Sequence, residues 1–294
     1  MEEDRSSTIP KRQLGRYLRE GRDECGLTLE QAAKLIERSS STLQRMEKGT
    51  LSKIVAVDLD ALCALYDFNA AKTAAMKGLA AQANEDNWWH EYGHLIPEDF
   101  DIFVGLEAAA QSLITYESEL VPGLLQIPAY ASALMHAVFP DDSAEEHALR
   151  VQLRMRRQTR ITRKVRPAKF DVVLRESVLR GLVGGPKVMG AQARYLADIG
   201  TRSNVSIQIL PFRAGFPLGV AVGPFVILDF GEDKKGSPIE PPVVYRESYT
   251  GDLYLSKPAA VRRYHQAYEC LRRNALDAVA SRHLLRQVAK EYGA

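Results

Sequence analysis

The stretch LTLEQAAKLIERSSSTLQRMEKG, residues 27–49, has the pattern of two short helices joined by a tight turn. Thr28 and Gln31 match the Thr-x-x-Gln capping box, in which side chains satisfy free backbone N–H groups, so Thr28 is the predicted N-cap of the first helix. The pattern breaks over residues 37–39, and the second helix, STLQRMEK, ends at Gly49. The stretch therefore predicts two helices separated by about three residues.

Small and apolar residues occupy the positions at which these two helices would meet. Two alanines permit close approach, and three larger residues fall where a two-helix corner needs apolar contacts: Ala32, Ala33, Leu35, Leu43 and Met46. Such a corner is a helix-turn-helix, whose second helix enters the major groove of DNA with its N-terminus first. We therefore expect the helix over about residues 40–48 to contact DNA.

Three further helices are predicted around this motif. Their sequences are KRQLGRYLREGRDE (11–24), VAVDLDALCALYDF (55–68) and AAKTAAMKGLAAQA (70–83). Gly26 fits a left-handed C-terminal cap, and Asn69 fits an N-cap. Residues 8–82 are therefore expected to form an all-α domain of five helices.

Several residues at characteristic spacings make this segment resemble the XRE family of helix-turn-helix repressors, the phage-repressor type. They are Gly26, Leu27, Thr28, Ala33, Ser39, Ser41, Thr42, Arg45, Glu47 and Gly49. The resemblance implies that Ser39 caps the recognition helix, that Ser40, Ser41 and Gln44 meet base edges, and that Arg45 faces bases or phosphate. Serine hydroxyls specify bases weakly, whereas glutamine can bind adenine through two hydrogen bonds, so we expect discrimination to rest on Gln44 and Arg45.

The same resemblance implies contacts that position the domain. Glu47 matches a family glutamate that pairs with an arginine near the end of the first helix, where this chain has Arg22. Leu29 stands where many members carry a phosphate-binding glutamine, so Arg38 or Lys34 is expected to compensate. The further DNA-contacting residues predicted in this way are Thr28, Arg38, Thr50 and Lys53.

The charge of the segment agrees with a DNA-binding role. Between Arg5 and Lys53 the chain has eleven lysines and arginines against six aspartates and glutamates, although its overall formal charge is only +2. Contacts to phosphates supply much of the affinity of such proteins. A helical bundle that binds protein is the alternative. Because one short helix contacts few base pairs, we expect a homodimer on a palindromic operator of double-stranded DNA.

His90-Glu91-Tyr92-Gly93-His94 matches the His-Glu-x-x-His motif of zinc metallopeptidases. A helix-turn-helix protein fused to such an enzyme is therefore a second hypothesis. Its context is unfavourable, because Gly93 lies inside the required helix and Pro97 ends it soon afterwards. The alternative is a junction helix, within residues 83–101, that packs through its tryptophans.

From residue 102 the pattern changes to a mixture of strands and helices. Strands are predicted over SLITY (112–116), FDVVLRE (170–176), VSIQILP (205–211), PFVILDF (224–230) and VVYRE (243–247). Helices are predicted over 128–136, 144–164 and, in one or two pieces, 258–292. Because strands and helices do not alternate strictly, we expect residues 102–294 to form an α+β domain with a mixed sheet.

Residues 100–288 resemble a conserved domain of unknown function that follows XRE-type motifs in actinobacterial regulators of the WhiJ/AbaA kind. The stretches that carry the resemblance include FVGLEAAA (103–110), TYESELVPGLLQIPAY (115–130), SNVSIQILPF (203–212) and VVYRESYTGDLYL (243–255). The resemblance implies regulation in response to a small partner protein or a small-molecule effector. A partner-neutralising, antitoxin-like module that regulates its own synthesis is a third hypothesis.

Candidate ligand or partner residues of this domain lie at strand ends and in one apolar turn: Tyr116, Glu117, Leu124, Leu125, Glu176, Glu247 and Tyr249. The leucines either form an exposed partner groove or pack beneath the sheet. The acids and tyrosines either line a pocket or stand at its rim. The Gly- and Pro-rich loop 211–224 is either a binding loop or a plain surface hairpin.

Eight cations fall within residues 150–166: Arg150, Arg154, Arg156, Arg157, Arg160, Arg163, Lys164 and Arg166. They either contact DNA or an acidic ligand, or form a solvated face paired with acids such as Glu145 and Glu146.

Composition limits the remaining possibilities. The three cysteines are far apart, so neither a disulfide framework nor a cysteine-rich zinc site is expected. The polar N-terminus and the lack of a long apolar run predict a cytoplasmic protein without a membrane span. Without a dinucleotide-binding or phosphate-binding glycine motif or a nucleophile elbow, we expect neither catalysis nor a cofactor.

Overall fold

The computed structural model describes residues 9–51, 53–83, 92, 95, 98–232, 238, 240–249 and 251–293. The chain divides into two compact units, residues 1–109 and 110–294. Within the described residues the first unit is helical, and the second combines helices with a six-stranded mixed sheet. The expected fold class, an all-α domain followed by an α+β domain, is confirmed. Much of the predicted junction 83–101 lies outside the described residues.

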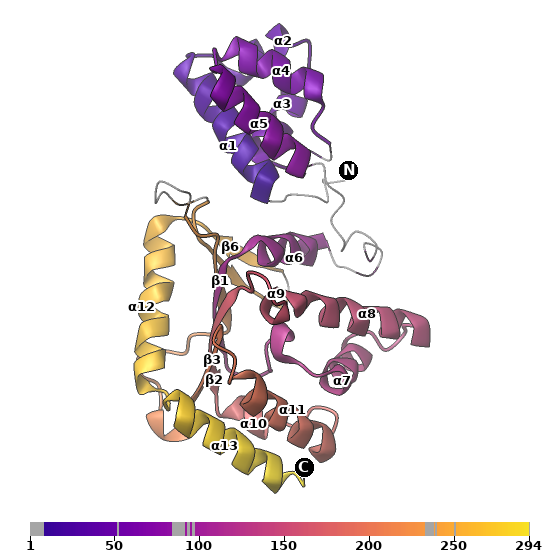
Figure 1. The fold of residues 1–294 in the computed structure, drawn as a ribbon, viewed down its shortest axis with the longest axis vertical. Helices are drawn as coiled ribbons and strands as arrows, with labels where there is room; N and C mark the ends of the chain where they lie inside the picture. Colours follow the sequence, from indigo (N-terminus) through magenta and orange to yellow (C-terminus); the bar gives the residue numbers. More distant parts are fainter. Residues whose placement is uncertain are drawn as a thin grey trace. The chain divides into compact units, whose positions relative to one another are not determined.

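Six helices form the described part of the first unit (Figure 1): α1 Ile9–Glu24, α2 Leu29–Leu35, α3 Ser40–Lys48, α4 Ala56–Leu65, α5 Ala70–Ala83 and α6 Glu98–Ala109. The expected caps explain where they begin. Thr28 and Gln31 form the capping box of α2, and Asn69 accepts a hydrogen bond from the backbone N–H of Lys72 at the start of α5. Gly26 adopts the left-handed conformation after α1, with φ of 65°.

One apolar core holds the helix-turn-helix together. Leu43 and Met46 are buried there beside Ala32 and Ala33, as the corner pattern predicts. The prediction for Leu35 is wrong, because its side chain is 60% exposed. The face of α2 that packs inward follows the helical spacing of residues 29, 32, 33 and 36, and Leu35 falls off that face.

The sheet of the second unit has the strand order β3-β2-β1-β4-β5-β6. Its strands are β1 Ser112–Glu117, β2 Lys169–Arg175, β3 Val205–Leu210, β4 Phe225–Asp229, β5 Val243–Arg246 and β6 Leu253–Leu255. Strands β1, β2 and β3 are parallel, whereas β4, β5 and β6 continue the sheet in antiparallel fashion. The parallel half therefore presents three carboxyl ends at one edge of the sheet.

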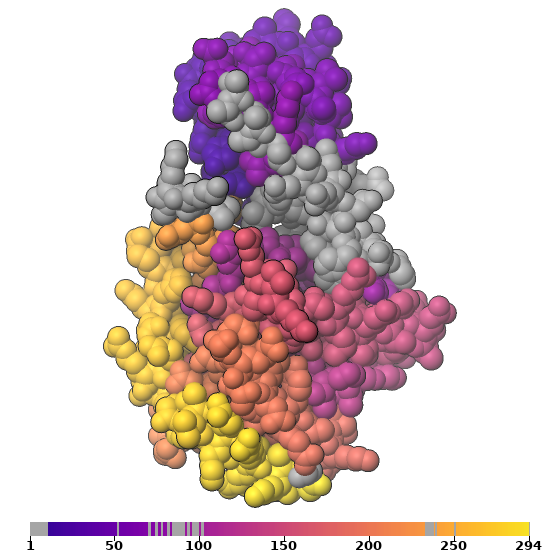
Figure 2. Space-filling model, viewed as in Figure 1, coloured from indigo at the N-terminus to yellow at the C-terminus, as the bar shows by residue number. Residues whose placement is uncertain are grey.

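Helices cover both faces of this sheet. Their bounds are α7 Pro128–Val138, α8 Ala144–Arg157, α9 Thr159–Thr162, α10 Ser177–Arg180, α11 Pro186–Ile199, α12 Pro258–Asn274 and α13 Ala278–Glu291. Right-handed crossovers from β1 to β2 and from β2 to β3 place α7–α9 and α11 on the same side, while α12 lies on the opposite face (Figure 1). In the space-filling view α12 and α13, in yellow, form part of the surface (Figure 2).

The turn LVPGLLQIP packs inside the second unit. Leu124 is 3% exposed and Leu125 is 0% exposed, so the proposal that they form an exposed partner groove is wrong. The amide of Gln192 on α11 donates to the carbonyl of Leu125 at 2.7 Å and accepts from the N–H of Ile127 at 2.8 Å. These hydrogen bonds fix the turn on α11, which buries the leucines.

No helix of the described residues has the length and apolar character needed to cross a membrane.

Candidate functional site

The start of α3 is built by a cluster of hydroxyl groups. Ser39 is the N-cap, and its Oγ accepts a hydrogen bond from the backbone N–H of Thr42 at 3.2 Å. The Oγ of Ser39 also lies 2.9 Å from Ser41 Oγ and 2.8 Å from Thr42 Oγ1. Ser41 is therefore partly committed to the cap, whereas Ser40 makes no side-chain hydrogen bond to a described residue.

One face of α3 is exposed and polar, and the other is buried. Leu43, Met46 and Glu47 pack inward. The exposed face carries Ser40, Ser41, Gln44, Arg45 and Lys48. Gln44 and Arg45 make no side-chain hydrogen bond or ion pair within the described part of the chain, so their polar groups are available to a partner.

An ion pair fixes α3 against α1. Glu47 accepts from Nε of Arg22 at 2.7 Å and from Nη2 at 3.0 Å, and its side chain is only 1% exposed. A further N–H of Arg22 donates to the carbonyl of Leu27 at 2.9 Å, which ties the turn before α2 to the same pair. Hydrogen bonds from Arg22 to Glu47 raise the pKa of the guanidinium, and the pair implied by the resemblance is formed.

Close backbone contact between α1 and α3 requires two glycines. A Cβ on Gly15 would lie 2.5 Å from the carbonyl oxygen of Glu47, and one on Gly49 would lie 2.7 Å from the backbone nitrogen of Arg12. Gly49 also has a left-handed φ of 70°. The sequence reasoning identified Gly49 as a helix end but missed Gly15, although a glycine inside an apolar helical pattern is itself a signal of close packing.

Several residues that were predicted to contact DNA interact with other groups of the protein. The guanidinium of Arg38 lies on Asp58 of α4, with N–O distances of 2.8 and 2.9 Å, and its side chain is 45% exposed. The Thr28 hydroxyl serves the capping box, and the Thr50 hydroxyl donates to the carbonyl of Arg45 at 3.3 Å. Lys53 is exposed. Arg38 lies just before α3 and Thr50 just after it, so their contacts help to position the helix.

Several arginines of the basic segment 150–166 interact with groups of the same domain. Arg150 pairs with Asp142 and stacks on the ring of Phe139, and Arg154 donates to the Gln126 amide oxygen at 2.9 Å. Arg157 is buried, and Arg160 donates to a backbone carbonyl. Glu146 caps α8 through Ser143, and Glu145 is exposed. Much of the positive charge of this segment therefore interacts with groups of the same domain.

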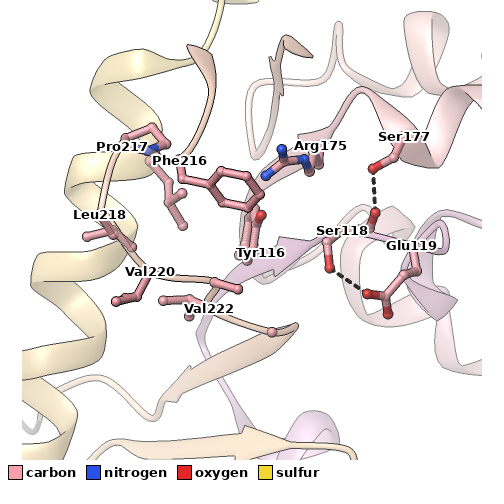
Figure 3. Close-up of a pocket in the computed structure, with 13 residues that line it drawn as sticks. Tyr116, Ser118, Glu119, Arg175, Ser177, Phe216, Pro217, Leu218, Val220 and Val222 are labelled. Carbon is pink, nitrogen blue, oxygen red and sulfur yellow. Dashed lines mark hydrogen bonds between the residues drawn. The ribbon is translucent and has the colours of Figure 1, made fainter. Parts of the chain in front are cut away.

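A cavity of about 320 Å³ lies at the carboxyl ends of the parallel strands (Figure 3). Tyr116, Ser118 and Glu119 reach it from the end of β1, and Arg175 and Ser177 reach it from the end of β2. The loop after β3 supplies an apolar wall: Phe216, Pro217, Leu218, Val220, Ala221, Val222 and Gly223. The loop 211–224 is therefore a wall of a cavity rather than a plain surface hairpin.

Of the predicted strand-end residues, only Tyr116 lines this cavity. Glu176 instead accepts from the N–H of Phe212 and from Arg180. Burial raises the pKa of the Glu117 carboxyl, with added repulsion from Glu247 and Glu119. Glu247 and Tyr249 are exposed, away from the cavity lining.

Sequence reasoning missed Arg175, Ser118 and Ser177. The alternation of side chains along a strand could have indicated Arg175, because this residue lies two positions after Val173 and therefore points to the same face of the sheet.

The candidate zinc motif lies largely outside the described residues, which include only Tyr92 of its five positions. In the part of the chain that the structure describes, no group of three or more His, Cys, Asp or Glu side chains is arranged to hold a metal ion.

Two protein-family models match the chain. One is described as a helix-turn-helix domain and matches residues 13–76, and the other is described as the domain of unknown function DUF5753 and matches residues 100–287. No curated protein and no solved structure shows a significant match. The two matched segments correspond to the helical unit that carries α3 and to the unit that carries the cavity.

Proposed function

The chain belongs to the family defined by the domain of unknown function DUF5753, and since a helix-turn-helix domain precedes that domain, we propose that it is a sequence-specific DNA-binding transcriptional regulator. One observation carries the proposal. Gln44 and Arg45 project from the exposed face of α3 without a side-chain hydrogen bond or ion pair to a described residue, on a helix that its buried face and the Arg22–Glu47 pair hold in place. Such a helix can enter the major groove with little rearrangement.

The proposed contacts divide into two classes. Gln44 and Arg45 discriminate between bases, while Ser40 and Ser41 set how closely α3 approaches them. Lys53 and the exposed part of Arg38 contact phosphates, which gives affinity without sequence preference. Asp58 holds one edge of the Arg38 guanidinium, so this arginine approaches DNA in a fixed orientation.

The C-terminal domain is proposed to regulate rather than to catalyse. Its resemblance to regulators of the WhiJ/AbaA kind supports a response to a small-molecule effector or a small partner protein. We expect the protein to bind a palindromic operator as a homodimer, because two recognition helices double the contacts that one short helix makes.

Selection of genomic fragments by the purified full-length protein tests the proposal. The expected result is a set of enriched fragments that share one sequence motif with two-fold symmetry. Light scattering of the protein, free and with the selected fragment, then gives the stoichiometry. Enrichment without a shared motif would contradict sequence-specific binding, and a monomer on the fragment would contradict the dimer.

A further inference from the structure

The cavity of the C-terminal domain lies where open sheets with parallel strands bind ligands, outside the carboxyl ends of the strands. Its lining comes from the ends of β1 and β2, from the loop after β3 and from Leu271 of α12. Its volume of about 320 Å³ falls at the lower end of the usual range for small-molecule sites. The space therefore suits a small compound and excludes a folded partner.

Arg175 is the basic side chain in the lining of this cavity. Its side chain is half-buried, and its guanidinium lies 4.5 Å from the ring centroid of Phe216. It makes no hydrogen bond or ion pair to any described residue. Arg150 and Arg154 of the same domain, also withdrawn from solvent, donate to a carboxylate and an amide oxygen. Because a charge that is partly withdrawn from water is stabilised by a counter-charge, the guanidinium of Arg175 offers an open position for an anion.

The other polar groups narrow the choice of anion. Ser177 donates to the carbonyl of Ser118, and the hydroxyl of Ser118 bonds to the carboxylate of Glu119 at 3.0 Å (Figure 3). The hydroxyl of Tyr116 makes no hydrogen bond to a described residue, so it can donate beside Arg175. Glu119 offsets the charge of Arg175, so the lining has no surplus of positive charge for a phosphate or another polyanion.

The apolar walls of the cavity favour a ligand that has an apolar body. Phe216 is 61% exposed and Val220 is 64% exposed, which is unusual for large apolar side chains that converge on one space. With Leu218 and Val222 they form a surface that a ligand would cover.

We propose that this cavity binds a small monocarboxylate with an aromatic or branched apolar body. The carboxylate lies on Arg175 and the hydroxyl of Tyr116, and the body lies against Phe216, Leu218 and Val222. The binding of such a compound to the cavity does not depend on the proposed function. An effect of the compound on DNA binding does rest on that function.

Calorimetric titration of the full-length protein tests the proposal without DNA. The probes are phenylacetate, benzoate and isovalerate, with phenylacetamide as the neutral analogue of the first, and acetate and inorganic phosphate as anions without an apolar body. At least one of the three carboxylates is expected to bind saturably with one site per chain. Phenylacetamide is expected to bind at least about tenfold more weakly because it cannot form the charge-assisted hydrogen bond to Arg175. Acetate and phosphate are expected to bind at least about tenfold more weakly because they have no apolar body to cover the walls of the cavity.

Variants identify the site. Arg175→Gln is expected to weaken the best probe at least about tenfold, and Tyr116→Phe by a smaller factor. Arg213→Gln, which removes an exposed charge from the same loop but not from the cavity lining, is the matched control and should bind like the parent. Circular dichroism and thermal unfolding confirm that each variant is folded.

Three outcomes would overturn the inference: no saturable binding of any of the three carboxylates, equal binding of phenylacetamide, or unchanged binding by a folded Arg175→Gln variant. Fluorescence anisotropy on the selected operator, with and without the bound probe, forms a separate arm. If the protein binds no operator in the anisotropy experiment, the proposed function is refuted, but the calorimetric result on the cavity is unaffected.

Discussion

The helix-turn-helix domain and the C-terminal cavity use arginine in opposite ways. In the first, Arg22 and Arg38 lie on the largely buried carboxylates of Glu47 and Asp58 and hold helices in place, while the exposed Arg45 extends from α3 without an ion pair to any residue that the structure describes. In the second, Arg175 is half-buried, lies on the ring of Phe216 and makes no ion pair within the described part of the chain. A DNA-binding surface can leave its arginine in water, whereas a half-buried arginine in a cavity is stabilised by a ligand that supplies a counter-charge.

The largest effect should come from breaking the scaffold of the first region. Gly15→Val places a side chain within 2.5 Å of the backbone of α3, where neither backbone can move without separating the helices. We expect a loss of about 3 kcal/mol or more in the free energy of unfolding of the N-terminal domain, measured by denaturant titration. Gly181→Ala, whose Cβ would meet its nearest neighbour at 3.7 Å, is the control and should change little. Full stability of Gly15→Val would mean that α1 and α3 do not pack as described.

Removing the charge of Glu47 should have the next largest effect. Glu47→Gln keeps an acceptor for Arg22 but removes the buried counter-charge of its guanidinium, whose carboxylate is 1% exposed, and leaves only the exposed carboxylate of Asp23. We expect a loss of about 2 kcal/mol in the free energy of unfolding of the N-terminal domain. Glu291→Gln breaks a pair to Arg180 whose partners are 42% and 36% exposed, and should cause no measurable loss. Equal losses in the free energy of unfolding for the two substitutions would contradict the expectation that the buried ion pair contributes more than the exposed one.

A smaller, pH-dependent effect is expected for Glu117 beside the cavity. Burial raises the pKa of this carboxyl above its ordinary value of 4.5. As pH rises past 4.5, the unfolded chain releases its proton before the folded chain does, so stability falls through that window. Glu117→Gln should therefore be more stable than the parent by about 1 kcal/mol at neutral pH, with little difference below pH 4. Glu145→Gln on α8 controls for the loss of charge. A difference in stability between Glu117→Gln and the parent that does not change with pH would contradict the prediction.

The smallest effect is expected at Lys53, which should change DNA binding without changing stability. Lys53→Ala removes one exposed cation that we assign to a phosphate contact. Affinity should fall by a similar factor on specific and non-specific fragments, and the slope of log affinity against log salt should decrease by about one. A loss confined to the specific fragment would place Lys53 among the residues that discriminate between bases.

The two regions also differ in how far the sequence predicts them. The ends of α2 and α3 follow from contacts a few residues apart, namely the capping box at Thr28, the cap at Ser39 and the glycine at 49. The same local pattern misplaced Leu35, because a helix of seven residues leaves little margin for deciding which side faces inward.

The cavity was not predictable in the same way. The strands and most helices of the C-terminal domain follow their hydrophobic patterns, but the cavity depends on the loop 211–224 crossing the ends of β1 and β2. Arg175, Ser118 and Phe216 come together only through strand pairing between segments dozens of residues apart. Leu124 and Leu125 were open to two interpretations because only the tertiary contact with α11 decides that they are buried.

The central claim is that the exposed face of α3 discriminates between DNA sequences, and one measurement tests it most directly. Fluorescence anisotropy on the operator selected by the parent protein compares the Gln44→Ala and Arg45→Ala double variant with Arg273→Ala, which removes one exposed charge on α12. At the same salt concentration the double variant should lose at least about tenfold in specific affinity while remaining folded, because each good base contact is worth about 1–3 kcal/mol. Arg273→Ala should bind like the parent. A folded double variant with undiminished specific affinity would contradict the account.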